Sequence, residues 1–470
     1  MSESLDEKVK RVFGEFAVDK KLTRASIISR IPTFIAEFLV GRLCQEPSEE
    51  CIEQVASRVN ELYPDPRSKE LFLGRLKEER QVKILDEFRV RVNLKKNIFL
   101  LQVPALGIDD ALIEEGILKN NERLYSGLWG VGLLVYEPAL QGKYQSVTPV
   151  IMQDFEPFQA YNIDVNLFRE ARSEFTLSEW IDLLVTSIGL NPSAYSLRQK
   201  ILILVRLIPM AEANVNLLEL GPRATGKTFT YRNLTYYSRI HSGGIVSPAK
   251  LFYDARSNIP GDLVVNDVVV FDEISKIKFA NSDEVVAKLK DYMVDGYFER
   301  GSFHPKRPSA CSLVFIGNVD IERASTPLGL VSHLPSFMHD TAFLDRIHGF
   351  IHGWELPKIM KSEEHLARGY GIASDYLAEV LHQVRTVSLE QEIDSLFEFL
   401  GAPTIRDEKA VKKILSGALK LLFPSQEYDR AELAIVAEPL VELRNNVNQL
   451  LNTLSPREFP PRKLSLKIRG

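Results

Sequence analysis

The 470-residue sequence has no apolar run long enough to cross a membrane and no secretory leader among its first residues. The apolar stretch Ile201–Leu207 is interrupted by Arg206, whereas a membrane helix needs about 20 mostly apolar residues. The opening MSESLDEKVKR carries charges of both signs and lacks the apolar core of a signal peptide. We therefore expect neither a membrane-spanning segment nor secretion.

Cysteine is scarce, because only Cys44, Cys51 and Cys311 occur, and their spacing suggests neither a zinc site nor a disulfide. This usage predicts a protein of the reducing cytoplasm. A strong charge imbalance is also missing, since 58 Lys and Arg against 63 Asp and Glu leave a formal net charge of −5. That mean value does not predict nucleic-acid binding, so basic surfaces must be sought locally.

Length and composition predict several globular domains, because the chain is too long for one small module and 45% of it is hydrophobic. Residues 1–165 are predicted to form an N-terminal α+β region with a DNA-binding role. Residues 166–360 alternate apolar strands with helices, which predicts an α/β core with helices on both faces of a parallel sheet. Residues 361–455 are predicted to form a helical lid without strands. The basic, proline-broken residues 456–470 resemble a linker.

The predicted sheet strands are short and almost continuously apolar, as in strands buried on both faces. They are Val215–Leu220, Gly244–Val246, Val264–Phe271 and Ser312–Gly317.

The strongest motif directly follows the first of these strands and precedes a helical stretch. It reads Gly221-Pro222-Arg223-Ala224-Thr225-Gly226-Lys227-Thr228. Glycines let the backbone N–H groups face phosphate oxygens, Lys227 would reach the β- and γ-phosphates, and the Thr228 hydroxyl would hold Mg²⁺. The alternative is a chance glycine-rich turn, which the strand-then-helix context disfavours. The motif predicts binding of ATP with Mg²⁺.

Polar residues end the next two buried strands. Asp272 and Glu273 follow one strand, where Asp272 would bind the metal and Glu273 would activate the attacking water. Asn318 ends the other strand and could orient that water. The alternatives are an ordinary solvated acidic pair and an Asn that caps a loop.

Two arginines further along the chain suit the γ-phosphate. Arg346 is too distant in sequence for the P-loop lysine's task and could act across a subunit boundary, or it could be a surface Arg paired with Asp345. Arg406 precedes a predicted helix Glu408–Leu422 with Asp407 as its N-cap, and it could report the nucleotide state to the lid. A surface ion pair is the alternative for Arg406 as well.

His348 and His352 are four residues apart, but Gly349 and Gly353 argue against a helix there, and two ligands do not make a metal site. We assign no metal role to either.

In this order, the motifs resemble the AAA+ ATPase superfamily. More narrowly, LGPRATGKT, VVVFDEISKIKF, LKDYMVDGYFERG and FLDRIHGFIHGWELPK resemble BrxL, the family of Lon-like proteins of BREX phage-defence systems. The resemblance runs from about residue 80 to 455. It implies an AAA+ motor related to the MCM type, double-stranded DNA as partner, and a homo-oligomeric ring, hexameric or stacked into a dodecamer, with other BREX proteins as further partners.

The family pattern also includes a C-terminal Lon-like protease domain, which would begin where this sequence ends. No segment like its catalytic Ser motif occurs before Gly470. We therefore expect a short form of a longer protein, with ATPase activity and no protease activity.

Residues for DNA contact are the least specific prediction. A β-hairpin over Val82–Val103 would place Arg89 and Arg91 on one face, with Lys95 and Lys96 in its turn. The resemblance identifies Tyr297–Arg307 as a hairpin that points into a ring channel, with Arg300, Lys306 and Arg307 as its cations. A polar strand face and a solvated turn are the alternatives.

Three functions compete. The first is an ATP-driven ring motor on double-stranded DNA in antiphage defence, with nucleotide at a subunit interface. The second is a protein unfoldase that feeds a Lon-type protease, although the expected aromatic-hydrophobic-Gly pore loop is missing after the P-loop. The third is a scaffold with ATP as a structural ligand, which complete phosphate and metal motifs disfavour.

Overall fold

The computed structural model describes residues 3–21, 31–44, 48–94, 96–125, 127–144, 147–158, 163–254, 259–298, 306–320, 322 and 326–469. By its internal contacts the chain divides into two compact units. The barrel unit is Val18–Ile163, and the sheet unit is Met1–Ala17 with Asp164–Gly470. In the described ranges, no helix has both the length and the hydrophobicity to cross a membrane.

The first 17 residues belong to the sheet unit, whereas the sequence placed them in an N-terminal region 1–165. Their helix α1 (Leu5–Phe13) buries Val9 and Phe13. Lys8 of this helix forms an ion pair of 2.9 Å with Glu179 of α8 (Leu177–Ser187). This packing, which links residues 171 positions apart, is not visible in local periodicity.

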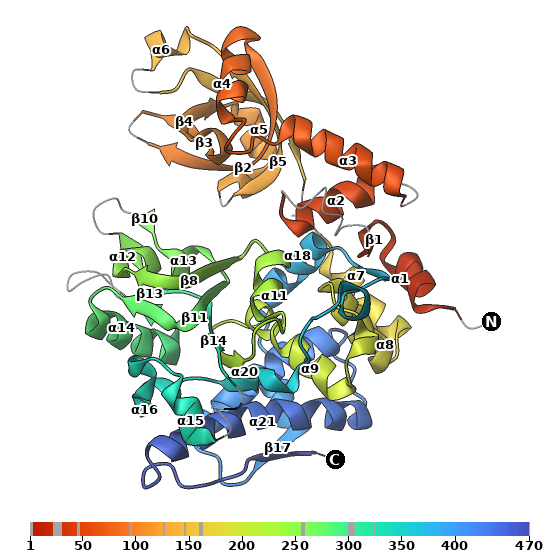
Figure 1. Cartoon of the computed structure of the whole chain (residues 1–470), viewed down its shortest axis with the longest axis vertical. Coiled ribbons are helices and arrows are strands. Elements are labelled where there is room, and N and C mark those ends of the chain that lie inside the picture. Colours follow the sequence, from red (N-terminus) through yellow and green to blue (C-terminus); the bar gives the residue numbers. More distant parts are fainter. Residues whose placement is uncertain are drawn as a thin grey trace. The chain divides into compact units, whose positions relative to one another are not determined.

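The barrel unit is built on a closed five-stranded barrel, drawn in orange in Figure 1. The strand order is β2-β3-β4-β6-β5, and neighbours are antiparallel except for the parallel pair β4 and β6. Alternate residues of the strands point inward and form an apolar core that includes Ile84, Phe88, Leu101 and Met152. The elements of this unit are α2 (Thr33–Leu43), α3 (Glu49–Leu62), α4 (Lys69–Glu78), β2 (Gln81–Asn93), β3 (Ile98–Val103), β4 (Ile108–Ile113), α5 (Glu115–Asn120), β5 (Leu128–Tyr136), α6 (Leu140–Lys143) and β6 (Val150–Pro157).

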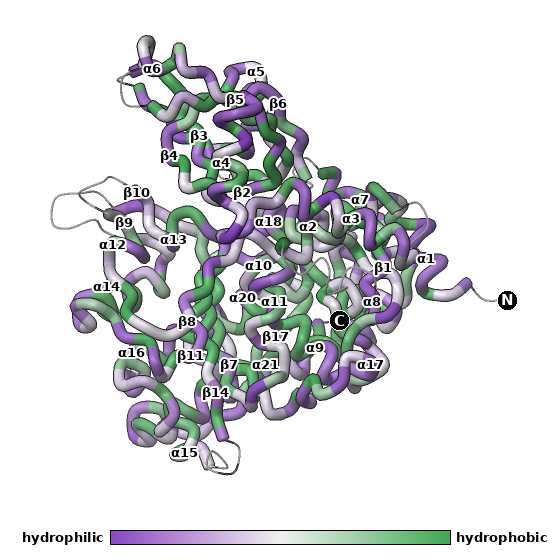
Figure 2. The backbone as a smooth tube through the Cα atoms, turned by 45° about the horizontal axis from the view of Figure 1, so that its top comes forward, coloured by the Kyte–Doolittle hydropathy of each residue, from purple (hydrophilic) through white to green (hydrophobic). Residues whose placement is uncertain are grey.

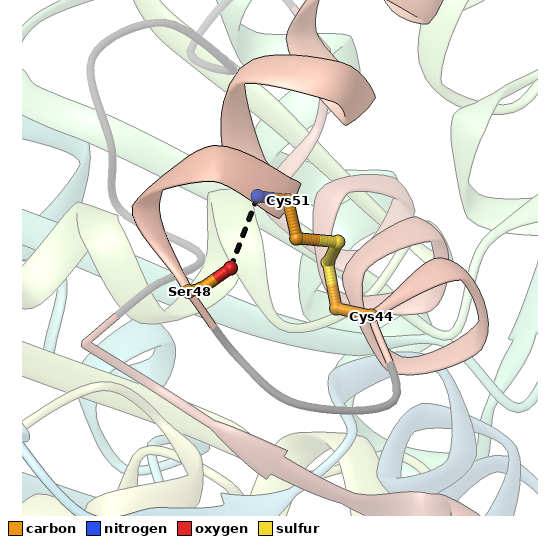
Figure 3. The surroundings of a disulfide bond; sticks show 3 residues. All are labelled: Cys44, Ser48 and Cys51. Atoms are coloured by element: carbon orange, nitrogen blue, oxygen red, sulfur yellow. Dashed lines mark hydrogen bonds between the residues drawn. A yellow bond between two sulfur atoms is a disulfide. The ribbon is translucent and has the colours of Figure 1, made fainter.

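A disulfide joins Cys44 to Cys51, with 5.8 Å between their Cα atoms (Figure 3). The prediction that no disulfide would form was wrong. Cys44 directly follows α2, and Cys51 lies in the first turn of α3, where the Ser48 hydroxyl caps the helix by accepting the Cys51 N–H at 3.2 Å. Consecutive helices thus bring the two thiols together. Cysteine usage therefore gives no support to a reducing compartment.

The sheet unit is centred on a five-stranded, wholly parallel sheet in the order β15-β7-β14-β11-β8. The predicted parallel sheet is confirmed. Helices α10, α11, α14, α20 and α21 pack against its strands, and Figure 2 shows both hydrophobic and hydrophilic residues along β8 and β11. The strands are β7 (Asn216–Gly221), β8 (Ser238–Val246), β11 (Val268–Phe279), β14 (Ser312–Asn318) and β15 (Gly349–His352).

Three details of this sheet differ from the sequence prediction, and the first is that β8 starts at Ser238, six residues before the predicted Gly244. Val264 and Val265 belong to a short helix, α13 (Asp262–Val265), so β11 starts later and continues past the acidic pair to Phe279. The strand β15 was missed, because it is four residues long and begins with a glycine, so it carries little periodic signal.

The remaining elements of the sheet unit connect and cover this sheet. The helices are α7 (Val165–Ala171), α9 (Leu197–Val205), α10 (Ile208–Ala211), α11 (Lys227–Asn233), α12 (Pro248–Leu251), α14 (Ser282–Asp295), α15 (Pro327–Ser332), α16 (Thr341–Leu344), α17 (Ser362–His365), α18 (Ser374–Val384), α19 (Glu390–Leu396), α20 (Ile405–Leu422) and α21 (Arg430–Leu454). The short strands are β9 (Tyr253–Asp254), β10 (Ile259–Pro260), β12 (Tyr297–Phe298), β13 (Arg307–Pro308), β16 (Tyr370–Ile372), β17 (Phe397–Leu400) and β18 (Ser465–Ile468), and the residues of β1 (Ala17–Asp19) are divided between the two units.

The C-terminal residues 456–470 were predicted as an unpacked linker, and this prediction of their packing was wrong. Strand β18 pairs antiparallel with β17, so the predicted strandless lid also contains strands. Leu464 is buried, and its backbone N–H and C=O bond to the side chain of Asn445 on α21 at 2.8 and 2.9 Å. Leu466 and Ile468 of β18 are half-buried, and the prolines and charged residues around them hide this alternation in the sequence.

Candidate nucleotide site

The phosphate-binding motif forms a loop between β7 and α11, as the sequence predicts. The helix starts at Lys227, so backbone N–H groups at its N-terminus face the loop. Gly226 has a φ of 76°, and a Cβ added there would lie 3.1 Å from Ile359 Cδ1. The loop therefore requires glycine at this position. Ala224 also adopts the left-handed region, with a φ of 64°.

Lys227 is folded onto the carbonyl groups of its own loop. Its Nζ donates to the carbonyls of Gly221 at 3.1 Å and Pro222 at 2.5 Å. Burial, which outweighs the attraction of Glu219 and Asp272, lowers the pKa of Lys227. A phosphate oxygen would offer this ammonium a charged acceptor in place of the neutral carbonyls, which is the stronger kind of hydrogen bond.

Asp272, Glu273 and Asn318 meet the loop at the carboxyl edge of the sheet, because β14 lies between β7 and β11. They line one pocket of about 500 Å³ together with residues 223–229 and Ser242. The Thr228 hydroxyl donates to Asp272 Oδ2 at 2.9 Å, while Asp272 Oδ1 accepts the Glu273 N–H at 2.8 Å.

This donor set fits Mg²⁺, which takes hard oxygen ligands and is commonly held by one carboxylate plus nucleotide phosphates. Thr228 and Asp272 would hold the ion. The ion would neutralise phosphate charge during transfer, and the chain itself would orient the phosphates and the water.

A fully buried ion pair lies beneath the loop and was not predicted. Arg206, at the end of α9, donates to Glu219 of β7 from Nη2 at 2.7 Å and from Nε at 3.1 Å. Its Nη1 has no partner among the described residues and lies 3.7 Å from a Cβ built on Gly226. The sequence does contain a signal for this pair, because Arg206 and Glu219 are the charged residues in two mostly apolar runs, Ile201–Leu207 and Val215–Leu220.

Arg346 lies at the opposite edge of the sheet from its own phosphate loop. It follows α16, and its carbonyl accepts a hydrogen bond of 3.0 Å from the side chain of Asn216, the first residue of β7. The loop follows the last residue of β7, six residues or about 20 Å along the strand. The Arg346 guanidinium donates to the carbonyl of Ala342, so the alternative of a pair with Asp345 is not what the structure shows.

Arg406 joins Arg346 at this edge through an ion pair with Asp345. It lies inside α20, which starts at Ile405 and is capped by Thr404 with Asp407 at its third residue, so the predicted helix start and N-cap were wrong. Thr404-x-x-Asp407 is a capping box. In the described residues, Arg406 makes the surface ion pair that was its alternative, and no contact with its own phosphate loop is found.

A buried network fixes this edge. Arg444 of α21 donates to Asp345 Oδ1 at 2.6 Å and to Asp407 Oδ1 at 2.8 Å, and Arg462 reaches Asp407 Oδ2 at 3.0 Å. Burial, and then the neighbouring Arg406, lower the pKa of Arg346. The guanidinium groups of Arg346 and Arg406 are thus held at one edge, near enough for their charges to interact.

The predicted DNA contacts are only partly described. The hairpin of β2 and β3 is confirmed, and Arg89 and Arg91 are exposed on it. Arg89 pairs with Glu87 at 2.8 Å, and Arg91 donates to the carbonyl of Asp109 at 3.1 Å. Lys96 is exposed in the turn, whereas Lys95 lies outside the described residues.

In the sheet unit, β12 and β13 pair antiparallel, which confirms a hairpin at Tyr297–Arg307. Lys306 and Arg307 are exposed on it, and the Arg307 guanidinium lies 5.1 Å from the centre of the Tyr253 ring. Arg300 lies outside the described residues.

The two histidines have structural surroundings. His348 Nδ1 accepts the N–H of Asn216 at 2.8 Å, and burial lowers the pKa of His348 to about 3. His352 stacks on Trp354 with 4.3 Å between ring centres, and burial lowers its pKa to about 4.

A phosphate loop, an acidic pair and a polar strand end on one edge of a parallel sheet define a P-loop nucleotide-binding protein. Comparison with known families is more specific. Residues 150–465 match the model of the "Lon-like protease BrxL-like, ATPase domain", and residues 11–136 match that of the "BREX system Lon protease-like protein BrxL N-terminal". The chain belongs to the BrxL family, and its sheet unit carries the ATPase domain of that family.

Two curated relatives named "Lon-like protease BrxL" agree. The protein of Escherichia coli O9:H4 (strain HS) is 33% identical over 462 residues, covering 97% of this chain and 66% of the relative. That of Bacillus cereus (strain H3081.97) is 32% identical over 468 residues, covering 97% and 68%. The chain thus spans about two thirds of the length of these relatives. "Uncharacterized protein 440" of Sulfolobus islandicus rod-shaped virus 1 is 25% identical over 158 residues, 30% of this chain.

Proposed function

We propose that this protein is an AAA+ ATPase that works as a DNA-binding, MCM-like ring motor in BREX antiphage defence. The observation that carries the proposal is the joint lining of one pocket by the phosphate loop, Asp272, Glu273 and Asn318. In the proposed reaction Lys227 and the loop N–H groups hold the phosphates of ATP, Thr228 and Asp272 hold Mg²⁺, Glu273 activates water and Asn318 orients it.

The ring follows from the separation of the arginines from their own loop. Arg346 and Arg406 lie together at the amino edge of the sheet, and the loop lies at the carboxyl edge. Both cations can therefore reach a γ-phosphate only in a neighbouring subunit. A repeated head-to-tail contact of this kind closes into a ring, for which a hexamer or a stacked pair of hexamers is the expected form.

Two features support DNA as the partner, one a cationic hairpin and the other the topology of the barrel. The β12–β13 hairpin carries Lys306 and Arg307 beside Tyr253, and cations with aromatic rings suit a strand-tracking surface. The barrel has the five-stranded Greek-key character of folds that bind oligonucleotides.

One part of that barrel is already covered by the chain itself. Ile98 and Leu112 on the outside of β3 and β4 pack with Val147 and with Leu140 of the β5–β6 connection. DNA contact by the barrel is therefore proposed for the exposed side of β2, at Arg89 and Arg91. Lys95 and Lys96 would extend that contact into the turn.

The test is a gel-shift and ATPase assay on the whole chain with duplex, forked and single-stranded DNA at stated salt, because phosphate contacts weaken steeply with salt. We expect duplex DNA to bind and to raise ATP turnover. If the chain binds none of the three DNAs, the proposal is overturned.

The second candidate is an ATP-driven unfoldase module of a Lon-type protease, which the name of the two relatives, "Lon-like protease BrxL", favours. It predicts that unfolded protein, and not DNA, stimulates ATP turnover. A scaffold that only binds ATP predicts no turnover with either ligand. Protease activity is not expected from this chain, and the cytoplasm, where ATP and DNA meet, is the proposed compartment.

A further inference from the structure

Strand β11 is irregular at the residues that carry the proposed chemistry. Its pairing with β8 runs regularly to Asp272↔Ser242, and it resumes at Ile277↔Gly244 with a shifted register. Residues 273–276 therefore form a bulge between two paired stretches. Glu273 is the first residue of this bulge and Lys276 is the last.

The two ends of the bulge are joined by their side chains. Lys276 Nζ lies 3.0 Å from Glu273 Oε2, and both side chains are partly or well exposed. Glu273 has a φ of 51°, in the left-handed region that side chains other than glycine rarely adopt. Such backbone strain persists only where the surroundings impose it, and it gathers at functional sites.

The surroundings that impose this conformation are visible. Ile274 is fully buried, and its Cγ2 lies 3.2 Å from a Cβ built on Gly317, directly before Asn318. On the other side, Gly243 has a φ of 66°, and its added Cβ would lie 3.6 Å from Lys276 Cβ and 3.7 Å from Glu273 Oε2. The buried side chain of Ile274 thus fixes the bulge within the core, while Glu273 and Lys276 at its two ends lie next to Gly243.

We propose that Lys276 is a positioning residue that holds the Glu273 carboxylate in a charge-paired resting state. This inference rests on the proposed ATPase function, in which Glu273 activates that water. A carboxylate paired with an ammonium is a poorer acceptor for a water proton, so hydrolysis requires the pair to open.

The fold supplies a route by which a ligand opens the pair. Beyond the bulge, β11 leads into α14, and Gly296 alone separates α14 from β12 of the cationic hairpin. A polyanion bound at Lys306 and Arg307 would pull on this continuous segment. The bulge is where that segment meets Glu273, so DNA binding and release of the carboxylate are coupled.

The experiment compares the whole chain with its Lys276→Met and Lys276→Arg variants in ATPase assays with and without duplex DNA. Methionine keeps the length of the side chain and removes the charge. We expect Lys276→Met to raise kcat without DNA by about two- to fivefold, the range open to an exposed ion pair, with KM unchanged. Stimulation by DNA should fall by the same factor, and Lys276→Arg should restore the low basal rate.

Lys278→Met is the matched control, because Lys278 is exposed on the same strand two residues beyond the pair. A Lys276→Met protein whose basal kcat is unchanged or lower would overturn the inference. The proposed function fails separately, if Glu273→Gln leaves hydrolysis intact.

Discussion

At the scale of single residues, Gly226 decides whether the phosphate loop can form. A side chain in the left-handed region costs about 1–2 kcal/mol, and the Cβ of Gly226→Ala would also press on Ile359. We expect Gly226→Ala to weaken ATP binding by about tenfold or more, since 1.4 kcal/mol corresponds to tenfold. Fluorescent nucleotide titration measures this. Ala224→Gly is the control, because it relieves a positive φ and should bind ATP as well as the parent.

His348 makes the sheet unit sensitive to acid. Its pKa is about 3 in the folded chain because it is buried, and about 6.5 when unfolded, so the unfolded chain binds the proton more tightly. Its contribution to stability is complete above pH 6.5 and is lost as the pH falls toward 3. At pH 5.5 we expect a loss of about 1.4 kcal/mol relative to pH 7.5.

Denaturant unfolding at the two pH values measures this, with His348→Asn as the comparison, because its Oδ1 can still accept the Asn216 N–H. The loss between pH 7.5 and 5.5 should be about 1.4 kcal/mol smaller in the variant. An equal loss in both proteins would contradict the assignment.

At the scale of elements, the pairing of β18 with β17 predicts that the C-terminal segment stabilises the sheet unit. Leu464→Ala removes a buried side chain next to the backbone bonds to Asn445, so we expect a loss of about 2–5 kcal/mol in the free energy of unfolding. Lys467→Ala, at an exposed residue of β18, should change this free energy by less than about 0.5 kcal/mol. If both substitutions change the free energy of unfolding by equally small amounts, the C-terminal segment does not stabilise the sheet unit.

Elements whose cause is local were predictable. The loop at Gly221–Thr228 and the strands around Val270 and Val314 carry their own signal in a motif or an apolar run. Elements that depend on distant partners were not. The barrel closes only when Gln81 and Phe88 of β2 pair with residues of β5 that lie 54 and 40 positions later, and no local pattern encodes that register.

The candidate site divides in the same way. Lys227 follows β7, Asp272 lies in β11 and Asn318 ends β14, and these strands are neighbours in the sheet, so their meeting could be predicted. The pair of Arg206 with Glu219 and that of Lys276 with Glu273 depend on where side chains point after folding. Sequence spacing alone does not give that direction.

At the scale of the whole molecule, the position of Arg346 predicts that two inactive variants restore each other. Lys227→Ala disables the phosphate loop of its own subunit, and Arg346→Ala disables the site of the neighbour that the arginine should reach. Lys227→Ala alone should bind ATP poorly, and each of the two variants alone should have lost ATP hydrolysis. In a mixed ring, a loop from the Arg346→Ala subunit can meet an arginine from the Lys227→Ala subunit.

Random mixing at equal amounts makes about a quarter of the interfaces complete, so about a quarter of the parent ATPase rate should return if interfaces act independently. The measurement is steady-state ATP turnover after the two proteins are dissociated and reassembled together, with each variant treated alone as the control. If Arg346 served its own subunit, every subunit in the mixture would carry a defect, and no activity would return.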